Sequence, residues 1–551
     1  MRDALSRGEV DLQALAACPK YAAVGSHPRR GTAKRVAQAR LDARAHRLDH
    51  ARVAHAPAFW VPGSVPRAGG SLDLRPAHGG GTALAGEATG ERNAAPRCQS
   101  DPDGVVRALP RMHGRASHRP ECYRLTAMLA TFVDGTSAFE HALSRLESRG
   151  ETDFARVEPV VREILAAVRA EGDAAVQRYA EQFGRRAPKL IVRDYPGAAA
   201  LARLPAEARE ALELAAARVR SFHERERETG FRYEDDGITL GVRVSPVGRA
   251  GVYAPGGKAR YPSSVIMSAV PAHVAGVPDI LVATPLAGDA SDDAIYAAAH
   301  LSGVSAIVDA GGAQAIAALA FGTETIPRVD KIVGPGNAYV ACAKRLVFGS
   351  VDIDGIAGPS EILVVADDEG DPRLVAADLL SQAEHDEAAY PLLVCMSDLM
   401  AEAVRRELDV QLAALPRAAI ARVAITHGAS FVVHSRERMA AVADRLAVEH
   451  LALHVTEPEA MLARIRRAGA AFIGPSTPEA MGDYLAGPSH VLPTGGAVRF
   501  GSPLGVYDFV TRTSIIRYTR EALKGHEKAV CAFARLEGLE GHARAVEARS
   551  R

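Results

Sequence analysis

Short apolar runs that alternate with amphipathic helical stretches constrain the fold of this chain more than any other feature of its sequence. Runs with strand character include VGRAGVYA, DILVAT, AIVDA, KIVG, EILVVA, PLLVC, FVVH and AFIG. Helical stretches such as AQAIAALAF and DPRLVAADLLSQAEH lie between many of them. Strands that alternate with helices in this way build largely parallel sheets covered by helices. The sequence therefore predicts an α/β fold.

The first 127 residues follow a different pattern. They are rich in Arg, Ala, Gly, Pro and His, and they show no sustained period of 3.6 or 2 residues. They carry about 20 Arg and Lys against about 11 Asp and Glu. Three interpretations remain open, namely a flexible tail, a basic interaction arm, or sequence upstream of a true start at Met128. We favour the last, and we expect residues 1–127 to be a disordered extension or an upstream mis-start.

Composition excludes several classes of protein. The formal net charge is +0, so nothing in the totals calls for nucleic acid or an anionic membrane as a partner. No apolar run is long enough to span a bilayer, and MRDALSRGEV lacks the apolar core of a secretory signal. The six cysteines are spread singly, which is typical of thiols in a reducing compartment. We therefore expect a cytoplasmic protein.

Three glycine-containing turns follow strand-like runs. They are Tyr253-Ala-Pro-Gly-Gly257, Gly334-Pro-Gly-Asn337 and Ala357-Gly-Pro-Ser360. Ligands of open α/β sheets bind at the carboxyl ends of the strands, where such turns lie, and glycine lets the backbone approach a phosphate or ribose. None of the three matches G-x-G-x-x-G. Each turn alone is more often structural, so their recurrence favours a ligand site only modestly.

The second half of the chain contains dispersed residues that could bind a metal. Gln382 and His385 are three residues apart, so they project from one face of a probable helix. The other candidates are Asp483 with His490, Glu449 with His450, and Glu537 with His542. Imidazoles with a carboxylate and an amide oxygen suit zinc, and manganese is possible. Any one histidine is more often structural, and spacing alone does not show that these residues converge.

Four segments in the same order and spacing resemble the signatures of the histidinol dehydrogenase family. They are DLLSQAEH at 378–385, VGPGNAYV at 333–340, IAGPSE at 356–361, and GDY at 482–484 followed by HVLPT at 490–494. The resemblance extends from about residue 128 to the C-terminus, and residues 1–127 have no counterpart. The set of segments is highly specific, unlike any single glycine motif.

This resemblance implies an activity and a fold. The family oxidises L-histidinol through L-histidinal to L-histidine, the last steps of histidine biosynthesis, with reduction of two NAD. Its fold has two Rossmann-like parallel-sheet domains, one inserted in the other, and small helical terminal segments that exchange across an intertwined homodimer. We expect an N-terminal arm at 128–148, a first α/β domain at 149–252 and 362–503, a second, NAD-binding α/β domain at 253–361, and a dimer-exchanging segment at 504–551.

The resemblance also implies roles for individual residues. The zinc ligands, for one ion per subunit, would be Gln382, His385, Asp483 and His542. The NAD contacts would be Tyr253, Gln314 and Asn337. The substrate contacts would be Ser360, Gln382, His385, His450, Asp483, His490, Glu537 and His542, the last two acting in the partner subunit's site.

Glu449 and His450 match the pair that the family uses for acid–base chemistry. A neutral histidine can take the hydroxyl proton as hydride leaves carbon, and Glu449 is a candidate to activate the water that hydrates the aldehyde. The family usually has proline directly before this pair, and here Val448 stands there. Since proline would restrain the backbone, its absence affects the pose of the pair rather than its chemistry.

Two rival functions stay open at this point. One is a related zinc- and NAD-dependent dehydrogenase of another polar alcohol, such as a sulfonated diol. Glu537 and His542 favour histidinol, because a sulfonate site should prefer cations. The other rival is a metal-binding structural or regulatory protein without turnover.

Overall fold

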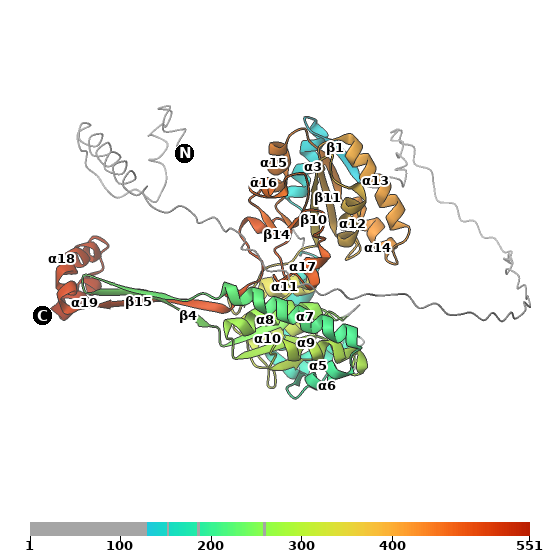
Figure 1. Ribbon diagram of the computed structural model, residues 1–551. Helices are drawn as coiled ribbons and strands as arrows, with labels where there is room; N and C mark the ends of the chain where they lie inside the picture. Colours follow the sequence, from blue (N-terminus) through green and yellow to red (C-terminus); the bar gives the residue numbers. More distant parts are fainter. Residues whose placement is uncertain (1–128, 151–153, 184–187, 257–259, 551) are drawn as a thin grey trace, which may run out of the picture. The chain divides into compact units, whose positions relative to one another are not determined.

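The computed structural model of the chain describes residues 129–150, 154–183, 188–256 and 260–550 (Figure 1). Our expectation for residues 1–127 falls outside these described residues. Two six-stranded sheets and one three-stranded sheet contain the strands of the described ranges. None of the helices in these ranges is long and apolar enough to cross a membrane.

The first six-stranded sheet, here called the β5 sheet, has the strand order β2-β7-β6-β5-β8-β9. Its strands are parallel except for β2, which pairs antiparallel to β7. They are β2 (Ile191–Val192), β5 (Arg249–Tyr253), β6 (Asp279–Ala283), β7 (Ala306–Val308), β8 (Lys331–Val333) and β9 (Asp352–Ile353).

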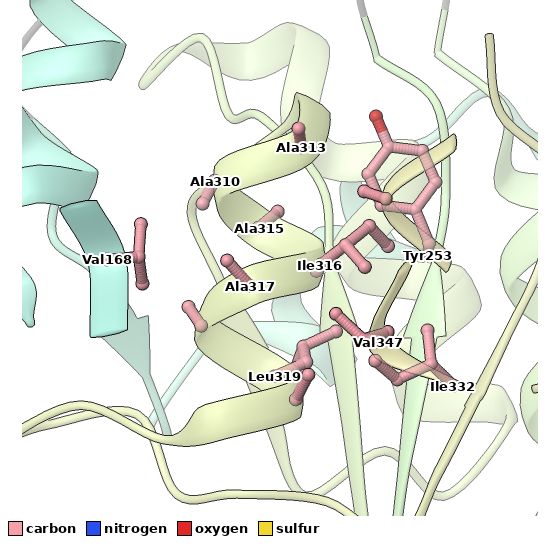
Figure 2. Packing of buried hydrophobic residues seen from close by; sticks show 14 of the residues in the cluster. Val168, Tyr253, Ala310, Ala313, Ala315, Ile316, Ala317, Leu319, Ile332 and Val347 are labelled. Carbon is pink, nitrogen blue, oxygen red and sulfur yellow. The ribbon is translucent and has the colours of Figure 1, made fainter. Parts of the chain in front are cut away.

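Two apolar clusters bury this sheet between helices. One cluster includes residues of α4 (Glu158–Glu171), α5 (Asp173–Gln182), α10 (Gly312–Phe321) and α11 (Ala338–Val347). The other includes residues of α7 (Ala206–His223), α8 (Pro262–Ala275) and α9 (Asp293–Leu301). In Figure 2, α10 lies between Val168 of α4 and the strand residues Tyr253 and Ile332. Helix α10 is rich in alanine, which lets its backbone pack closely on its neighbours.

The second six-stranded sheet, here called the β10 sheet, has the order β1-β12-β11-β10-β13-β14 and is parallel throughout. Its strands are β1 (Ala130–Val133), β10 (Glu361–Ala366), β11 (Tyr390–Cys395), β12 (Ala429–Val432), β13 (Val448–His454) and β14 (Ala468–Ile473). The helices on its two faces are α3 (Ser137–Glu147), α15 (Arg436–Leu446) and α16 (Pro458–Leu462) on one, and α12 (Pro372–Ala383), α13 (Asp398–Leu412) and α14 (Ala418–His427) on the other.

The two sheets have the same strand order, with β5 and β10 in corresponding positions. Because β2 to β9 lie between β1 and β10 in the chain, the expected insertion of one α/β domain in another is confirmed.

The insertion begins earlier than we expected from the sequence. Residues 149–252, assigned above to the same domain as 362–503, pack with the β5 sheet instead. They supply β2 and β5, and the apolar face of α4 joins the core around α10. The segment 128–148, expected to be an arm, contributes the edge strand β1 and helix α3 to the β10 sheet. The reason is long-range burial of apolar faces, which local periodicity does not report.

A three-stranded antiparallel sheet and two helices complete the described structure. The strands are β3 (Phe231–Asp235), β4 (Ile238–Pro246) and β15 (Val510–Tyr518), and the helices are α18 (Arg520–Leu536) and α19 (Glu540–Ser550). Cys531, Ala534 and Ala543 form a small core between α18 and α19. Shorter helices are α6 (Gly197–Arg203), η2 (Glu224–Glu226), η3 (Ala290–Asp292), α17 (Ala480–Tyr484), η4 (Ala497–Arg499) and η5 (Val506–Phe509).

Candidate active site and metal centre

Charged side chains gather at the amino ends of β10 and β13, two neighbouring interior strands of the β10 sheet. Glu361 is the first residue of β10. Glu449 and His450 are the second and third residues of β13, and His450 pairs with Ile362 of β10. Glu449 and His450 are 6% and 5% exposed. Because buried charged groups are costly unless they have partners, this edge is a candidate functional site.

A buried ion pair fixes Glu449. The Arg149 guanidinium forms two hydrogen bonds with the Glu361 carboxylate, one of them from Nη2 to Oε1 at 2.7 Å. Glu361 Oε1 also accepts from the backbone N–H of Glu449 and of Gly495, each at 3.1 Å. In return, the Glu361 backbone N–H donates to Glu449 Oε2 at 3.0 Å. Both the backbone and the side chain of Glu449 are therefore held by one residue.

His450 is oriented by the same strand. Its Nδ1 lies 3.1 Å from the carbonyl oxygen of Glu361. A carbonyl oxygen can only accept, so Nδ1 carries the proton and the lone pair of Nε2 remains available. Burial lowers the pKa of His450, which keeps the ring neutral. Burial, and then the Glu361 carboxylate, raise the pKa of Glu449 well above its usual value.

His385, Glu479 and Asp483 form a cluster whose ligand atoms lie within 4.8 Å of one another. His385 follows α12, Glu479 directly precedes α17, and Asp483 lies on α17. His385 Nε2 is 3.7 Å from Asp483 Oδ2, and Glu479 Oε1 is 3.8 Å from His450 Nε2. Burial and the Glu479 carboxylate raise the pKa of Asp483 to about 7. A divalent cation would relieve this repulsion between carboxylates.

Two buried oxygens support a metal at this cluster. Gln382, on the last turn of α12, is 1% exposed, and its Oε1 has no hydrogen-bond partner among the described residues. The same holds for Glu479 Oε1, although Oε2 of that carboxylate accepts from Ser381 at 2.8 Å. A buried amide oxygen and a buried carboxylate oxygen without partners are what a bound cation would satisfy. The donor set of imidazole, carboxylate and amide oxygen fits zinc.

His490 contacts Asp483 and lines a cavity next to the cluster. Its Nδ1 lies 3.1 Å from the Asp483 carbonyl oxygen, and burial lowers its pKa to about 4. A cavity of about 350 Å³ is lined by His450, Asp483 and His490. Its other walls are mostly apolar and include Phe222, Phe472, Met481, Leu492 and Leu504, with one further carboxylate from Glu226. The volume suits a small molecule with one polar end at the cluster.

A second candidate site lies at the carboxyl ends of the β5 sheet. The chain runs from β5 to β6 and β7 on one side, and then returns to β8 and β9 on the other side of β5. Dinucleotides bind at such a change of direction in open α/β sheets. Tyr253 ends β5, and the turn Gly334–Asn337 follows β8.

Polar groups at this change of direction fit a ligand. The Tyr253 hydroxyl accepts from the Gly312 backbone N–H at 3.0 Å. Gln314, at the start of α10, is 3% exposed, and its Oε1 has no partner in the described ranges. Asn337 caps α11 by accepting from Tyr339 and Val340 backbone N–H groups, so its side-chain oxygen is already used. The three predicted NAD contacts thus lie at one edge of this sheet, Tyr253 at the end of a strand, Gln314 in the first turn of a helix and Asn337 at a helix N-cap.

Most of the predicted polar residues converge, but two do not. Ser360 directly precedes Glu361, and its carbonyl oxygen accepts from the Tyr390 N–H at 3.0 Å. Glu537 ends α18 and His542 lies on α19, and both are exposed. Across the described part of the chain, no hydrogen bond or ion pair links either residue to His385 or Asp483. Within one chain, the cluster therefore lacks these two groups.

Sequence reasoning missed Glu479. Glu479 lies four residues before Asp483, and this spacing on one helical face was the available signal. It also missed the part of Arg149 and Glu361 in holding Glu449, for which the sequence contains no local signal.

This chain is similar to known proteins along most of its length. The family model described as histidinol dehydrogenase matches residues 147–550. A histidinol dehydrogenase of Syntrophotalea carbinolica is 50% identical over 426 residues, covering 76% of this chain and 98% of that protein. One of Pseudomonas aeruginosa is 50% identical over 395 residues, covering 71% and 90%. The crystal structure of histidinol dehydrogenase from Elizabethkingia anophelis aligns with a TM-score of 0.72 at 32% identity, covering 77% of this chain and 98% of that one.

Proposed function

Since this chain belongs to the histidinol dehydrogenase family, we propose that the edge of the β10 sheet described above is where it oxidises L-histidinol to L-histidine. The chain is an NAD-dependent oxidoreductase of histidine biosynthesis. The observation that carries the proposal is the buried pair Glu449–His450 beside the cluster of His385, Glu479 and Asp483. The pair can move protons, and the cluster can bind a cation that grips the substrate.

His450 accepts the proton in each oxidation. Its Nε2 lone pair is unprotonated and faces the cluster, since Nδ1 donates to the Glu361 carbonyl oxygen. As the hydroxyl proton passes to Nε2, a hydride leaves the carbon that bears the hydroxyl group, and the aldehyde forms. After His450 has passed its proton to solvent and water has added to the aldehyde, the hydrate loses a hydroxyl proton to His450 and a second hydride, and the carboxylic acid results. NAD accepts the hydrides when it is bound.

Glu449 activates the water of the second half-reaction. A carboxyl group with a raised pKa is a stronger base once it is ionised, so it can take a proton from water near neutral pH. The hydrogen bond from the Glu361 N–H keeps one oxygen of Glu449 fixed and leaves the other to act. Val448, in place of the family's usual proline, is buried in the core of the β10 sheet, which restrains the pair instead.

Gln382, His385 and Asp483 hold the zinc ion in this proposal, with manganese as the second choice of metal. The partnerless Oε1 of Gln382, among the described residues, supports it as a ligand. When bound there, zinc would supply a Lewis acid that accepts the nitrogen lone pairs of the substrate's neutral amine and imidazole. Glu479 adds a further carboxylate oxygen beside the cluster.

The fourth ligand, His542, comes from a second copy of the chain. Helix α18 exposes large apolar side chains along one face, among them Phe533 at 65% and Leu536 at 83%, and β15 exposes Ile516 at 69%. Apolar surface of this extent is typical of an interface. We therefore infer a homodimer in which β15, α18 and α19 reach the partner, so that Glu537 and His542 complete the partner subunit's site.

Three residues support NAD as the cofactor. Tyr253, Gln314 and Asn337 form the NAD site at the change of direction in the β5 sheet. The buried Oε1 of Gln314, which has no partner within the described ranges, supports this site.

Cys342, Cys395 and Cys531 are free buried thiols, in keeping with the proposed cytoplasmic location.

The carboxylates argue against the rival sulfonated diol. The cluster presents the carboxylates of Glu479 and Asp483 beside a candidate cation site, where a sulfonate site would instead need cationic side chains. In the decisive experiment, purified protein is given L-histidinol and NAD, and both NADH and L-histidine are measured. We expect two NADH for each histidine formed, and no NADH with a sulfonated diol. NADH from the sulfonated diol alone would reverse the assignment.

A further inference from the structure

A buried lysine that the proposed reaction does not use lies beneath the turn after β8. Lys344, on α11, is 2% exposed. Its Nζ donates to the carbonyl oxygen of Gly334 at 3.0 Å and forms an ion pair with Asp354, which directly follows β9. A buried ammonium group is costly unless it is paired and hydrogen-bonded, so the arrangement needs an explanation beyond packing.

Asp354 binds the other backbone group of the same glycine. Its Oδ2 accepts from the Gly334 N–H at 2.7 Å, while Oδ1 accepts from the Gly355 N–H at 2.8 Å. Both peptide groups of Gly334 are therefore held by one ion pair. Two charge-assisted hydrogen bonds to one residue fix its backbone more firmly than neutral bonds would.

The backbone of Gly334 packs closely against the last residue of β5, Tyr253. The φ of Gly334 is +110°, and a Cβ at this position would lie 2.1 Å from the carbonyl oxygen of Tyr253. Holding Gly334 therefore also sets the distance between the turn after β5 and the turn after β8. These two turns flank the change of direction where the dinucleotide site was placed above.

We propose that the Lys344–Asp354 ion pair is the positioning element of the NAD site, which it builds by clamping Gly334 and so fixing the turns that carry Tyr253 and Asn337. The inference rests on the proposed function, because it takes this edge as the NAD site. Neither Lys344 nor Asp354 needs to touch the cofactor. They act through the backbone of Gly334.

The chain offers a matched control at the other end of β8. Lys331 is also nearly buried, at 5% exposed, and its Nζ is 2.8 Å from Asp352. It starts β8, whereas the clamped turn follows the last residue of that strand. Replacing Lys331 removes the ion pairs of a nearly buried lysine with Asp352, which is itself half-exposed, and with Asp508, without touching Gly334.

The test measures the binding of NADH by its fluorescence. It compares the wild-type chain with the Lys344→Met, Asp354→Asn and Lys331→Met variants, each as the full zinc-loaded chain. We expect Lys344→Met to raise the Kd for NADH about tenfold and to leave the KM for L-histidinol within about twofold. Asp354→Asn, which keeps an oxygen to accept from Gly334, should raise the Kd in the same direction by less. Lys331→Met should leave the Kd unchanged even if it lowers the Tm.

The outcomes separate this inference from the proposed function. If the wild-type chain binds no NADH, the NAD site itself is wrong. If the wild type binds NADH and Lys344→Met binds it equally well, only the clamp is wrong. Equal weakening by Lys331→Met would also overturn the clamp, since it would show a general loss of strand stability. If Lys344→Met fails to fold, Asp354→Asn decides the question by the same criterion.

Discussion

The β5 sheet and the β10 sheet share one strand order, yet their candidate sites lie at opposite ends of the strands. In the β5 sheet, Tyr253 and the turn from Gly334 follow the carboxyl ends of β5 and β8. In the β10 sheet, Glu361, Glu449 and His450 lie at the amino ends of β10 and β13, which are the corresponding strands. Topology therefore indicates where a ligand can bind, and side chains decide which edge is used.

The carboxyl edge of the β10 sheet is closed by its own hydrogen bonds. Asp367, just after β10, accepts from the N–H and the hydroxyl of Thr456, each at 2.7 Å. His454, the last residue of β13, binds the Asp378 carboxylate of α12 at 2.8 Å. These bonds occupy the place where the β5 sheet exposes its turns. The comparison teaches that one duplicated topology can supply a cofactor edge in one copy and a reaction edge in the other.

The largest expected effect is a loss of turnover, and it should distinguish a replacement at the amino end of β13 from one at its carboxyl end. His450→Asn should lower turnover by about a thousandfold, because the base that takes the hydroxyl proton is lost, while the Kd for NADH should stay unchanged. His454→Asn is the matched control, since it changes a buried histidine of the same strand at the closed edge. It should cost about 1–3 kcal/mol of stability and leave turnover within a few-fold. Similar turnover losses in both variants would mean that the site is not confined to the amino edge.

A second prediction concerns the metal cluster beside that edge. Asp483→Ala should release zinc and lower turnover by at least about a hundredfold, because an inner ligand and its charge are lost. Chelation of the native enzyme should have the same effect, reversed by added zinc. Asp386→Ala, close to His385 but exposed, should retain both zinc and activity. Metal analysis of the three proteins checks this, and a fully active metal-free enzyme would contradict it.

A third prediction follows from the pKa of Asp483, which is raised to about 7 without metal. Zinc binding must displace that proton, so the affinity for zinc should fall about tenfold for each pH unit below 7. A raised carboxyl pKa means that the folded state binds the proton more tightly than the unfolded state does. The metal-free protein should therefore lose stability as pH rises from about 4 to about 7. Calorimetric zinc titration and thermal melts at several pH values measure both trends, and flat profiles would exclude them.

The smallest expected effect concerns the second chain. Turnover at the β10 sheet should depend on it, whereas NADH binding at the β5 sheet should not. A Gln382→Ala chain and a His542→Ala chain should each be inactive alone. Random reassembly makes about half of the dimers mixed, with one intact site each, so about a quarter of wild-type activity should return. NADH binding at the β5 sheet should be the same in all samples. If exchange of subunits is demonstrated and no activity returns, His542 serves its own chain.

The sequence by itself determined the fold class and most of the chemical groups. Alternating strands and helices predicted parallel sheets, and the family resemblance, carried by short motifs, implied that Gln382, Glu449 and Asp483 serve one site. These properties depend on neighbours close in the chain, because periodicity and short motifs are local. The resemblance to the histidinol dehydrogenase family also implied the insertion of one domain in another, which the sheet topology confirms.

Tertiary structure alone decided which sheet each segment joins and which edge carries the chemistry. Residues 149–252 read as helices and strands from sequence, but only burial against α10 assigns them to the β5 sheet. Glu479 meets Ser381 across 98 positions of the chain, and Arg149 meets Glu361 across 212. Such contacts form because parallel strands bring distant residues to one edge, where desolvation makes charged groups seek each other. Local patterns carry no information about that convergence, so Glu449, His450 and the Arg149–Glu361 ion pair became one candidate site only in the folded chain.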